Sequence, residues 1–150
     1  MAVELDETDQ RILGKLMEDA SKSLAHIARE LDLPRPTVNY RIQRMRKNGI
    51  IQKFTVLRDY AKLGQGMTTF VFVRHEPGQE VTVRELAERV AELEAVYEVH
   101  LITGEWDLLL KVRTEDLEEV GSLLLDRLRR IEGVGATLTS SALLTVKEEV

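Results

Sequence analysis

The sequence predicts an α+β protein with two parts, a helical N-terminal part and a C-terminal part in which strands alternate with helices. Apolar residues recur at helical spacing through residues 7–47, and the pattern becomes extended after Gly49. From residue 67 onward, strand-like and helix-like stretches alternate. The predicted division is therefore a first domain over 1–52, a strand and hinge linker over 53–66, and a second domain over 67–150.

The composition is that of a globular protein. Hydrophobic residues make up 43% of the 150 positions, which is enough to build packed cores. The chain has no cysteine, so disulfides, thiol nucleophiles and thiolate zinc sites are excluded. No apolar run approaches the roughly 20 residues of a membrane span, and the N-terminus is acidic, unlike a signal peptide. The expected localisation is cytoplasmic.

Charge is distributed unevenly along the chain. Residues 1–60 contain 11 lysines and arginines against 9 aspartates and glutamates, net +2, whereas residues 61–150 contain 10 against 17, net −7. Seven basic residues and no acidic one lie between Leu33 and Arg58. Such a block is either a solvated face or the footprint of a polyanionic partner, and its helical context decides between them.

Two short amphipathic helices are expected first. Asp6 and Ser23 are each placed as N-caps, because a side-chain oxygen at that position accepts a bond from a free backbone N–H of the first turn. The apolar residues that follow at helical spacing are Ile12, Leu13, Leu16 and Met17 in the first helix, and Leu24, Ile27, Ala28 and Leu31 in the second.

The third helix is predicted to begin at Pro36, which suits a first helical turn, and to stop at Asn48-Gly49. Its apolar stripe is narrow and contains Val38, Ile42 and Met45. Only Asp32 and Leu33 separate it from the second helix. Two helices joined this tightly, the second rich in hydrogen-bond donors, indicate a helix-turn-helix.

The polar positions of this third helix divide by their place along it. An α-helix fits the major groove of DNA, where Arg can bond guanine and Asn can bond adenine in a bidentate manner. The residues predicted to read base edges stand at the helix start: Arg35, Thr37, Asn39, Tyr40 and Arg41. The cations predicted to contact phosphates, which position the protein without reading sequence, are Arg44, Arg46, Lys47, Lys53 and Arg58.

Four landmarks make a resemblance specific: LDxxDxxIL at Leu5 to Leu13, IARELDL at Ile27 to Leu33, TVxxRIxxM at Thr37 to Met45, and GII at Gly49 to Ile51. With these motifs the first part resembles the N-terminal domain of the Lrp/AsnC, or feast/famine, family. That resemblance implies a helix-turn-helix, winged-helix-like domain of a transcriptional regulator that binds double-stranded DNA.

The segment Ile50–Leu57 is rich in β-branched and aromatic residues and is predicted to be a strand, which a glycine-containing linker follows. The family resemblance implies that this segment forms a hinge and takes part in dimer pairing.

The second part is predicted to contain strands over 67–75, 96–103, 106–112 and 135–146, with helices over 82–93 and 115–131. The order βαββαβ is that of a ferredoxin-like unit, an antiparallel sheet with both helices on one face. The first strand is apolar on both faces, with Phe70 and Phe72 on one side and Val71 and Val73 on the other. We therefore expect the uncovered face to meet a second subunit in a homodimer.

This part resembles the family's ligand-sensing and assembly domain, which implies a bound amino-acid effector at the dimer interface and possible octamers. The matching motif is a Gly-x-x-Asp turn, here Gly104-Glu105-Trp106-Asp107. Backbone N–H groups near Gly104 suit a carboxylate, and Asp107 suits an ammonium group. An ordinary hairpin, with Gly104 in the turn and Asp107 as a cap, explains the same residues equally well. Thr103, Ser140 and Ser141 are added as hydroxyl donors.

No catalytic residue, metal site or cofactor is predicted. The histidines, His26, His75 and His100, are far apart and lack the spacing of metal ligands on one helical face. The alternative is an enzyme, because some proteins of this architecture resemble the regulators but act as sirohaem decarboxylase subunits of haem biosynthesis. Those use basic and histidine residues of the second domain, and no arginine cluster joins His75 and His100 here. The basic helix favours DNA.

Overall fold

The computed structural model describes residues 4–76, 78 and 80–148, and the chain divides into two compact units, residues 1–56 and 57–150. Each unit is described by itself. The boundary between them lies inside the predicted linker, residues 53–66. In the described part of the chain, no helix is long and apolar enough to cross a membrane.

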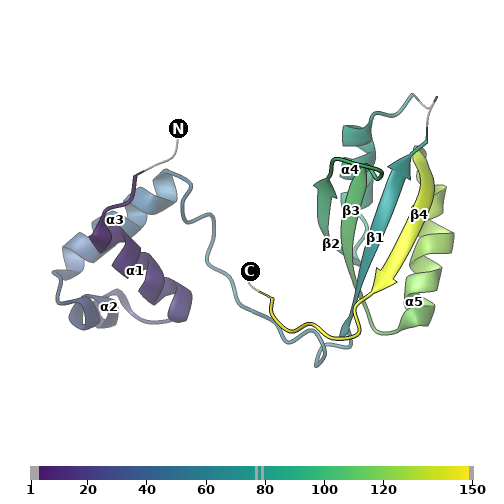
Figure 1. Cartoon of the computed structure of the whole chain (residues 1–150). Coiled ribbons are helices and arrows are strands. Elements are labelled where there is room, and N and C mark those ends of the chain that lie inside the picture. Colours follow the sequence, from purple (N-terminus) through teal and green to yellow (C-terminus); the bar gives the residue numbers. More distant parts are fainter. Residues whose placement is uncertain (1–3, 77, 79, 149–150) are drawn as a thin grey trace. The chain divides into compact units, whose positions relative to one another are not determined.

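The first unit contains the three predicted helices in its described residues: α1 (Glu7–Glu18), α2 (Leu24–Leu31) and α3 (Arg35–Lys47) (Figure 1). Both predicted caps are confirmed. Asp6 accepts a hydrogen bond from the backbone N–H of Asp9, and Ser23 accepts one from the backbone N–H of His26. Asp32, the C-cap of α2, has a left-handed conformation with φ of 53°, which turns the chain sharply toward α3.

One apolar core joins these helices. Its buried members are Ile12, Leu16, Ile27, Ala28, Leu31, Val38, Ile42, Met45 and Ile51. The narrow stripe predicted for α3 is confirmed, since all three of its members are buried. Met17 is an exception to the prediction for the first helix, because it is exposed one position beyond the buried Leu16.

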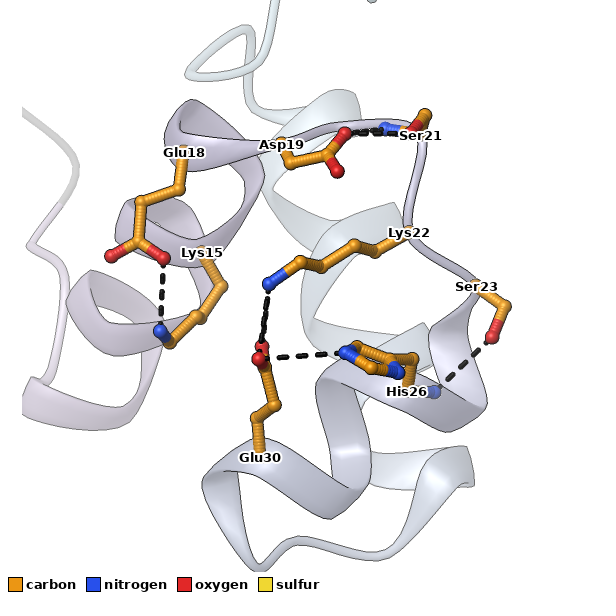
Figure 2. A network of polar contacts seen from close by, with 8 residues as sticks. All are labelled: Lys15, Glu18, Asp19, Ser21, Lys22, Ser23, His26 and Glu30. Carbon is orange, nitrogen blue, oxygen red and sulfur yellow. Dashed lines mark hydrogen bonds and ion pairs between the residues drawn. The ribbon is translucent and has the colours of Figure 1, made fainter.

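Polar contacts fix the connection between α1 and α2 (Figure 2). The Asp19 carboxylate accepts hydrogen bonds from the backbone N–H and the hydroxyl of Ser21, at 2.9 and 2.6 Å. The Glu30 carboxylate lies between Lys22, at 3.0 Å, and His26, at 3.4 Å. The hydrogen bond from Lys22 is the main cause that lowers the pKa of Glu30. These contacts hold the loop between α1 and α2 against α2.

The strand predicted over Ile50–Leu57 does not form in this chain. Ile51 packs into the core, but the residues after it run without strand pairing, and Phe54, Val56 and Leu57 are exposed. A strand exists only where its backbone groups find a partner strand, and no described segment of this chain pairs with this one. The prediction of a strand here is therefore wrong for the single chain, although the composition is that of a strand.

The second unit has the predicted βαββαβ order (Figure 1). Its strands pair antiparallel in the order β2-β3-β1-β4, as expected of a ferredoxin-like sheet. The elements are β1 (Met67–His75), α4 (Val83–Ala91), β2 (Val96–Leu101), β3 (Leu108–Thr114), α5 (Leu117–Ser122) and β4 (Val134–Ser141). The predicted helix over 115–131 is not uniform, because a π-helical turn (Leu123–Arg127) and a 3₁₀ turn (Leu128–Arg130) follow α5.

The two faces of this sheet differ. Val71 and Val73 of β1 are fully buried in a core that they share with Leu86 of α4 and with Leu123 and Leu128 of the two helical turns that follow α5. The alternating residues Phe70 and Phe72 lie on the opposite face and are only partly buried. Across the ladder, Phe72 stands beside Leu109 of β3 and Leu138 of β4 on this face. We call this face of the sheet, which α4 and α5 do not cover, the open face.

Candidate nucleic-acid interface and effector site

The outward side of α3 carries most of the residues predicted to contact DNA. Positions 35, 39, 43 and 46 follow one another at helical spacing, and the polar residues there and beside them are exposed. The exposed members are Arg35, Asn39, Tyr40, Gln43, Arg46 and Lys47. Gln43 was not among the predicted contacts, although the helical repeat alone places it between Asn39 and Lys47. Thr37 is half-buried.

Arg41 and Arg44 do not share that outward side. The Arg41 Nη1 atom lies 2.7 and 2.6 Å from the two carboxylate oxygens of Asp6 and 3.0 Å from Oδ1 of Asp9. Arg44 donates to the other oxygen of Asp9. The guanidinium of Arg41, a residue predicted to read a base, is thus directed at the start of α1.

The charges of this cluster stabilise one another. The hydrogen bond from Arg41, followed by that from the backbone N–H of Asp9, lowers the pKa of Asp6 to about 2. The same contact with Asp6 raises the pKa of Arg41. Asp9 has no exposed surface, so its carboxylate depends on the two guanidinium groups in place of water.

Arg46 lies over the ring of Phe54, with 5.9 Å from the guanidinium carbon to the ring centroid. This contact joins the end of α3 to the segment that follows it. Of the two later cations predicted to contact phosphates, Lys53 is exposed, and Arg58 donates to the Tyr60 hydroxyl at 3.3 Å.

The predicted effector turn connects β2 to β3. Gly104 has φ of +117°, a conformation that L side chains rarely adopt, so the glycine is required by the turn. The backbone N–H of Asp107 donates to the carbonyl of Val73 at 3.0 Å. The Asp107 carboxylate accepts a hydrogen bond from the backbone N–H of His75 at 2.7 Å. Asp107 therefore caps the end of β1, whereas the hairpin interpretation expected it to cap its own turn.

The middle of the turn is held by Arg74. Its Nε atom donates to the Glu105 carbonyl at 3.2 Å and its Nη2 atom to the Glu105 carboxylate at 2.9 Å. Its guanidinium also lies over the Trp106 ring, 5.1 Å from the centroid, and Trp106 packs on Phe72. Sequence reasoning missed Arg74, which lies 31 positions before Glu105 and has no motif of its own.

The other predicted effector residues are not gathered into one place. Thr103 is exposed in the turn, whereas Ser140 pairs with Phe70 and Ser141 with Thr69. The backbone N–H of Asp107 bonds to Val73, whereas Ser140 pairs with Phe70, three residues away along β1. At roughly 3.3 Å per residue, the two positions are about 10 Å apart. The Ser141 hydroxyl is 3.1 Å from that of Thr69. One chain does not bring Ser140 and Ser141 to the turn.

A further cluster, with no signal in the sequence, lies around Arg113 of β3. Arg113 is buried, and its guanidinium carbon is 3.7 Å from the centroid of the Tyr60 ring. Its Nη1 atom donates to the Thr68 hydroxyl at 3.2 Å, and its Nη2 atom to the Glu148 carboxylate at 2.5 Å. Lys111 also contacts Glu148. These partners are separated by 35 or more positions, so local patterns do not reveal them.

The histidines have structural contacts. His75 Nε2 is 2.6 Å from the carbonyl of Val81, and His100 is 3.2 Å from the Glu98 carboxylate. Among the described residues, no group of three or more acidic or histidine side chains is placed to hold a metal ion.

Comparisons with known proteins agree for both units. The AsnC-type helix-turn-helix domain matches residues 5–46, and the Lrp/AsnC ligand binding domain matches residues 68–150. An uncharacterized HTH-type transcriptional regulator of Pyrococcus horikoshii is 48% identical over 146 residues, which cover 97% of each chain. The HTH-type transcriptional regulator FL11 of Pyrococcus abyssi is 35% identical over 148 residues, 99% of this chain and 95% of its own.

Among solved structures, a transcriptional regulator from Neisseria meningitidis in complex with L-methionine superposes with a TM-score of 0.89. It is 25% identical, and the match covers 97% of this chain and 94% of that one. The relatives and the structure named here are described as regulators, and none of their names supports the sirohaem decarboxylase alternative.

Proposed function

The chain belongs to the Lrp/AsnC family of helix-turn-helix transcriptional regulators, and on this premise we propose how its own residues bind DNA and an effector. The single observation that carries the proposal is the outward side of α3, where exposed cations and amides stand on a helix whose opposite side is packed. The major groove admits such a helix.

The exposed residues of α3 take two roles in this proposal. Arg35, Asn39, Tyr40 and Gln43 read base edges, since their side chains offer the donors and acceptors that base pairs present in the major groove. Arg46 and Lys47, at the other end of the helix, contact phosphates. The net negative charge of the chain does not oppose this, because the acidic excess belongs to residues 61–150.

The test measures affinity for duplexes of several sequences over a range of salt. Binding should weaken steeply as salt rises, because each neutralised phosphate releases counterions. Lys47→Ala should weaken binding to all duplexes about equally and reduce the salt slope by about 1. Asn39→Ala should reduce the preference for one duplex over another. Lys62→Ala, which removes an exposed cation from the second unit, is the matched control. Affinity that does not change with salt would refute DNA binding by this surface.

For the effector, we propose a free amino acid bound at the Thr103–Asp107 turn. Two observations support it: Gly104 is exposed, with no atom within 4 Å of the place where a Cβ would stand, and a structural neighbour is described as a complex with L-methionine. The α-carboxylate would meet backbone N–H groups of the turn, and the ammonium would meet the Asp107 carboxylate. Ser140 is too far along the sheet to contact the same ligand from the same chain, so its contribution would come from a second copy.

A thermal-shift screen against the twenty amino acids tests this proposal, because a ligand stabilises only the state that it binds. Asp107→Asn is the decisive variant. Its side-chain oxygen can still accept from the His75 N–H and keep the strand cap, while the charge that would attract the ammonium is lost. We expect Asp107→Asn to abolish the shift, and Asp126→Asn, an exposed carboxylate of the same unit, to preserve it. If Asp107→Asn showed the same thermal shift as the wild type, the effector would not bind at this turn.

We also propose that the protein is a homodimer, assembled through the open face of the sheet, with octamers as a further level of assembly. Phe70, Phe72, Leu109 and Leu138 give that face an apolar surface that no described helix of the chain covers. The strand-like segment Ile50–Leu57 would pair with its equivalent in the second copy and make residues 53–66 a hinge. Sedimentation of Phe72→Glu tests this assembly, because a buried glutamate would dissociate the dimer.

A further inference from the structure

Of the arginines on α3, Arg41 and Arg44 differ from the others in what they contact. Both guanidinium groups lie against carboxylates at the start of α1, Asp6 and Asp9, which precede them by 32 or more positions. The side chains of Arg41 and Arg44 are 22% and 38% exposed, whereas that of Asp9 is 0% exposed. We call these four residues the α1–α3 clamp.

The two carboxylates of the clamp serve both helices at once. Asp6 accepts from the backbone N–H of Asp9 at 2.8 Å, and Asp9 accepts from that of Asp6 at 3.3 Å, which forms a capping box for α1. The same oxygen atoms receive Arg41 and Arg44. Because a capping box defines the first turn of a helix, the contacts fix that turn of α1 against the middle of α3.

We infer that Arg41 and Arg44 are positioning residues, which orient α3 for DNA through Asp6 and Asp9 and do not themselves contact the duplex. This inference rests on the proposed DNA binding by α3. To bond a phosphate with the atoms that hold Asp9, the guanidinium groups would have to leave it. The buried carboxylate would then keep only the Asp6 N–H as a partner, which costs more than a surface contact returns. Arg41 also lies beside Val38 and Met45 on the helical repeat, next to the core.

The alternative role makes the opposite prediction for one substitution. If Arg41 and Arg44 bound DNA, Asp6 and Asp9 would compete with the phosphates. Neutralising Asp9 would then free Arg44, loosen Arg41 and remove a negative charge, and binding would become tighter. If the four residues form a positioning clamp, neutralising Asp9 misorients α3 and binding becomes weaker. The sign of the change therefore separates the two roles.

The experiment uses the full chain and a labelled duplex that the wild-type protein binds, titrated at several salt concentrations. Asp9→Asn should bind at least about fivefold more weakly, the lower end of the cost of losing one specific contact. Arg41→Ala should lose affinity with an unchanged salt slope, because it releases no counterion, and Lys47→Ala should lower the slope by about 1. Glu7→Gln, an exposed carboxylate of the same helical turn outside the clamp, should not weaken binding.

Circular dichroism at the titration temperature shows which variants are folded, and only the DNA affinities of folded variants are compared. Should Asp9→Asn fail to fold, Asp6→Asn gives the same sign test. It weakens two of the three contacts of Arg41, while Asp6 is half exposed and the buried Asp9 contacts remain to keep the unit folded. Arg41→Lys should restore part of the affinity lost in Arg41→Ala. Unchanged or tighter binding by the folded aspartate variant, or a salt slope lowered by about 1 in Arg41→Ala, would overturn the clamp. Loss of all DNA binding by the wild-type protein would instead refute the proposed function.

Discussion

In each unit, a pair of neighbouring basic residues on one helix or strand shares a carboxylate. In the first unit, Arg41 and Arg44 of α3 contact Asp9, which is fully buried and belongs to α1. In the second, Lys111 and Arg113 of β3 contact Glu148, which is 31% exposed and lies outside any helix or strand. The chemistry is the same, but the elements that supply the carboxylates differ.

That difference indicates different roles. A carboxylate on a packed helix cannot leave without disturbing the core beside it, so the first pair is part of the architecture. Glu148 lies on a segment whose neighbours Leu144 and Val146 are exposed, so it can be displaced at small cost. Arg113 would keep the Tyr60 ring and the Thr68 hydroxyl as partners. We expect the second contact to be exchangeable.

The largest effect should come from the apolar residues beneath each pair. Ile42→Ala and Leu110→Ala each remove a large buried side chain, and each should destabilise its own unit by about 2–5 kcal/mol. The two cores share no residue, so each effect should remain in one unit. Hydrogen exchange followed along the chain measures this. Equal loss of protection in both units would contradict separate cores.

The next effect separates the two cation pairs directly. Asp9→Asn should destabilise the first unit by about 2–3 kcal/mol, somewhat below the cost of breaking a fully buried pair, because both arginines retain some exposure. Chemical denaturation followed by a signal from the first unit is the appropriate measurement. A change below the error of the method would show that the buried carboxylate contributes nothing.

Acid should weaken the α1–α3 clamp by protonating the Asp6 carboxylate. Its folded pKa of about 2 lies below its ordinary value of 3.8. A lowered pKa contributes stability that is fully present above about pH 3.8 and is lost as the pH falls through about 2. Carboxyl NMR titration should give Asp6 a midpoint near 2 in the wild type and a higher one in Arg41→Ala, where the backbone N–H of Asp9 still lowers the pKa. An unshifted midpoint in the wild type would contradict the contact.

Glu148→Gln should have a smaller effect. Hydrogen bonds from Lys111 and then Arg113 lower the pKa of Glu148 below its ordinary 4.5, so its contribution is present above that pH and disappears at lower pH. We expect a loss of less than about 1 kcal/mol at neutral pH, as for partly exposed ion pairs. Faster proteolysis of residues 142–148, with the rest of the unit intact, would show release of the segment. A loss as large as that of Asp9→Asn would remove the distinction between the pairs.

The smallest effect is expected for the exposed pair of Lys15 and Glu18 in Figure 2. Both partners stand on α1 three residues apart, and water screens their interaction. Glu18→Gln should leave the melting temperature unchanged within error. A measurable decrease would mean that exposed pairs also stabilise this unit.

Much of the fold could be predicted from the sequence, because local patterns determine it. The first strand was predicted at Met67–His75, where the structure has it, and the caps Asp6 and Ser23 were assigned from side-chain chemistry. Pairing was less predictable. The segment Ile50–Leu57 has the composition of a strand, but it forms none without a partner. Ser140 and Ser141 were grouped with the effector turn, although the register of β4 separates them from it.

The sequence by itself determined the two-part α+β organisation, the apolar side of α3 and the basic character of its remainder, since each depends on the spacing of residues within one element. Only the tertiary structure decided which cations face outward. Arg41 and Asn39 are two positions apart and equally polar in the sequence, yet one meets Asp6 and the other meets solvent. The reason is that α1 packs against one side of α3, and the carboxylates at the start of α1 form ion pairs with Arg41 and Arg44 on that side.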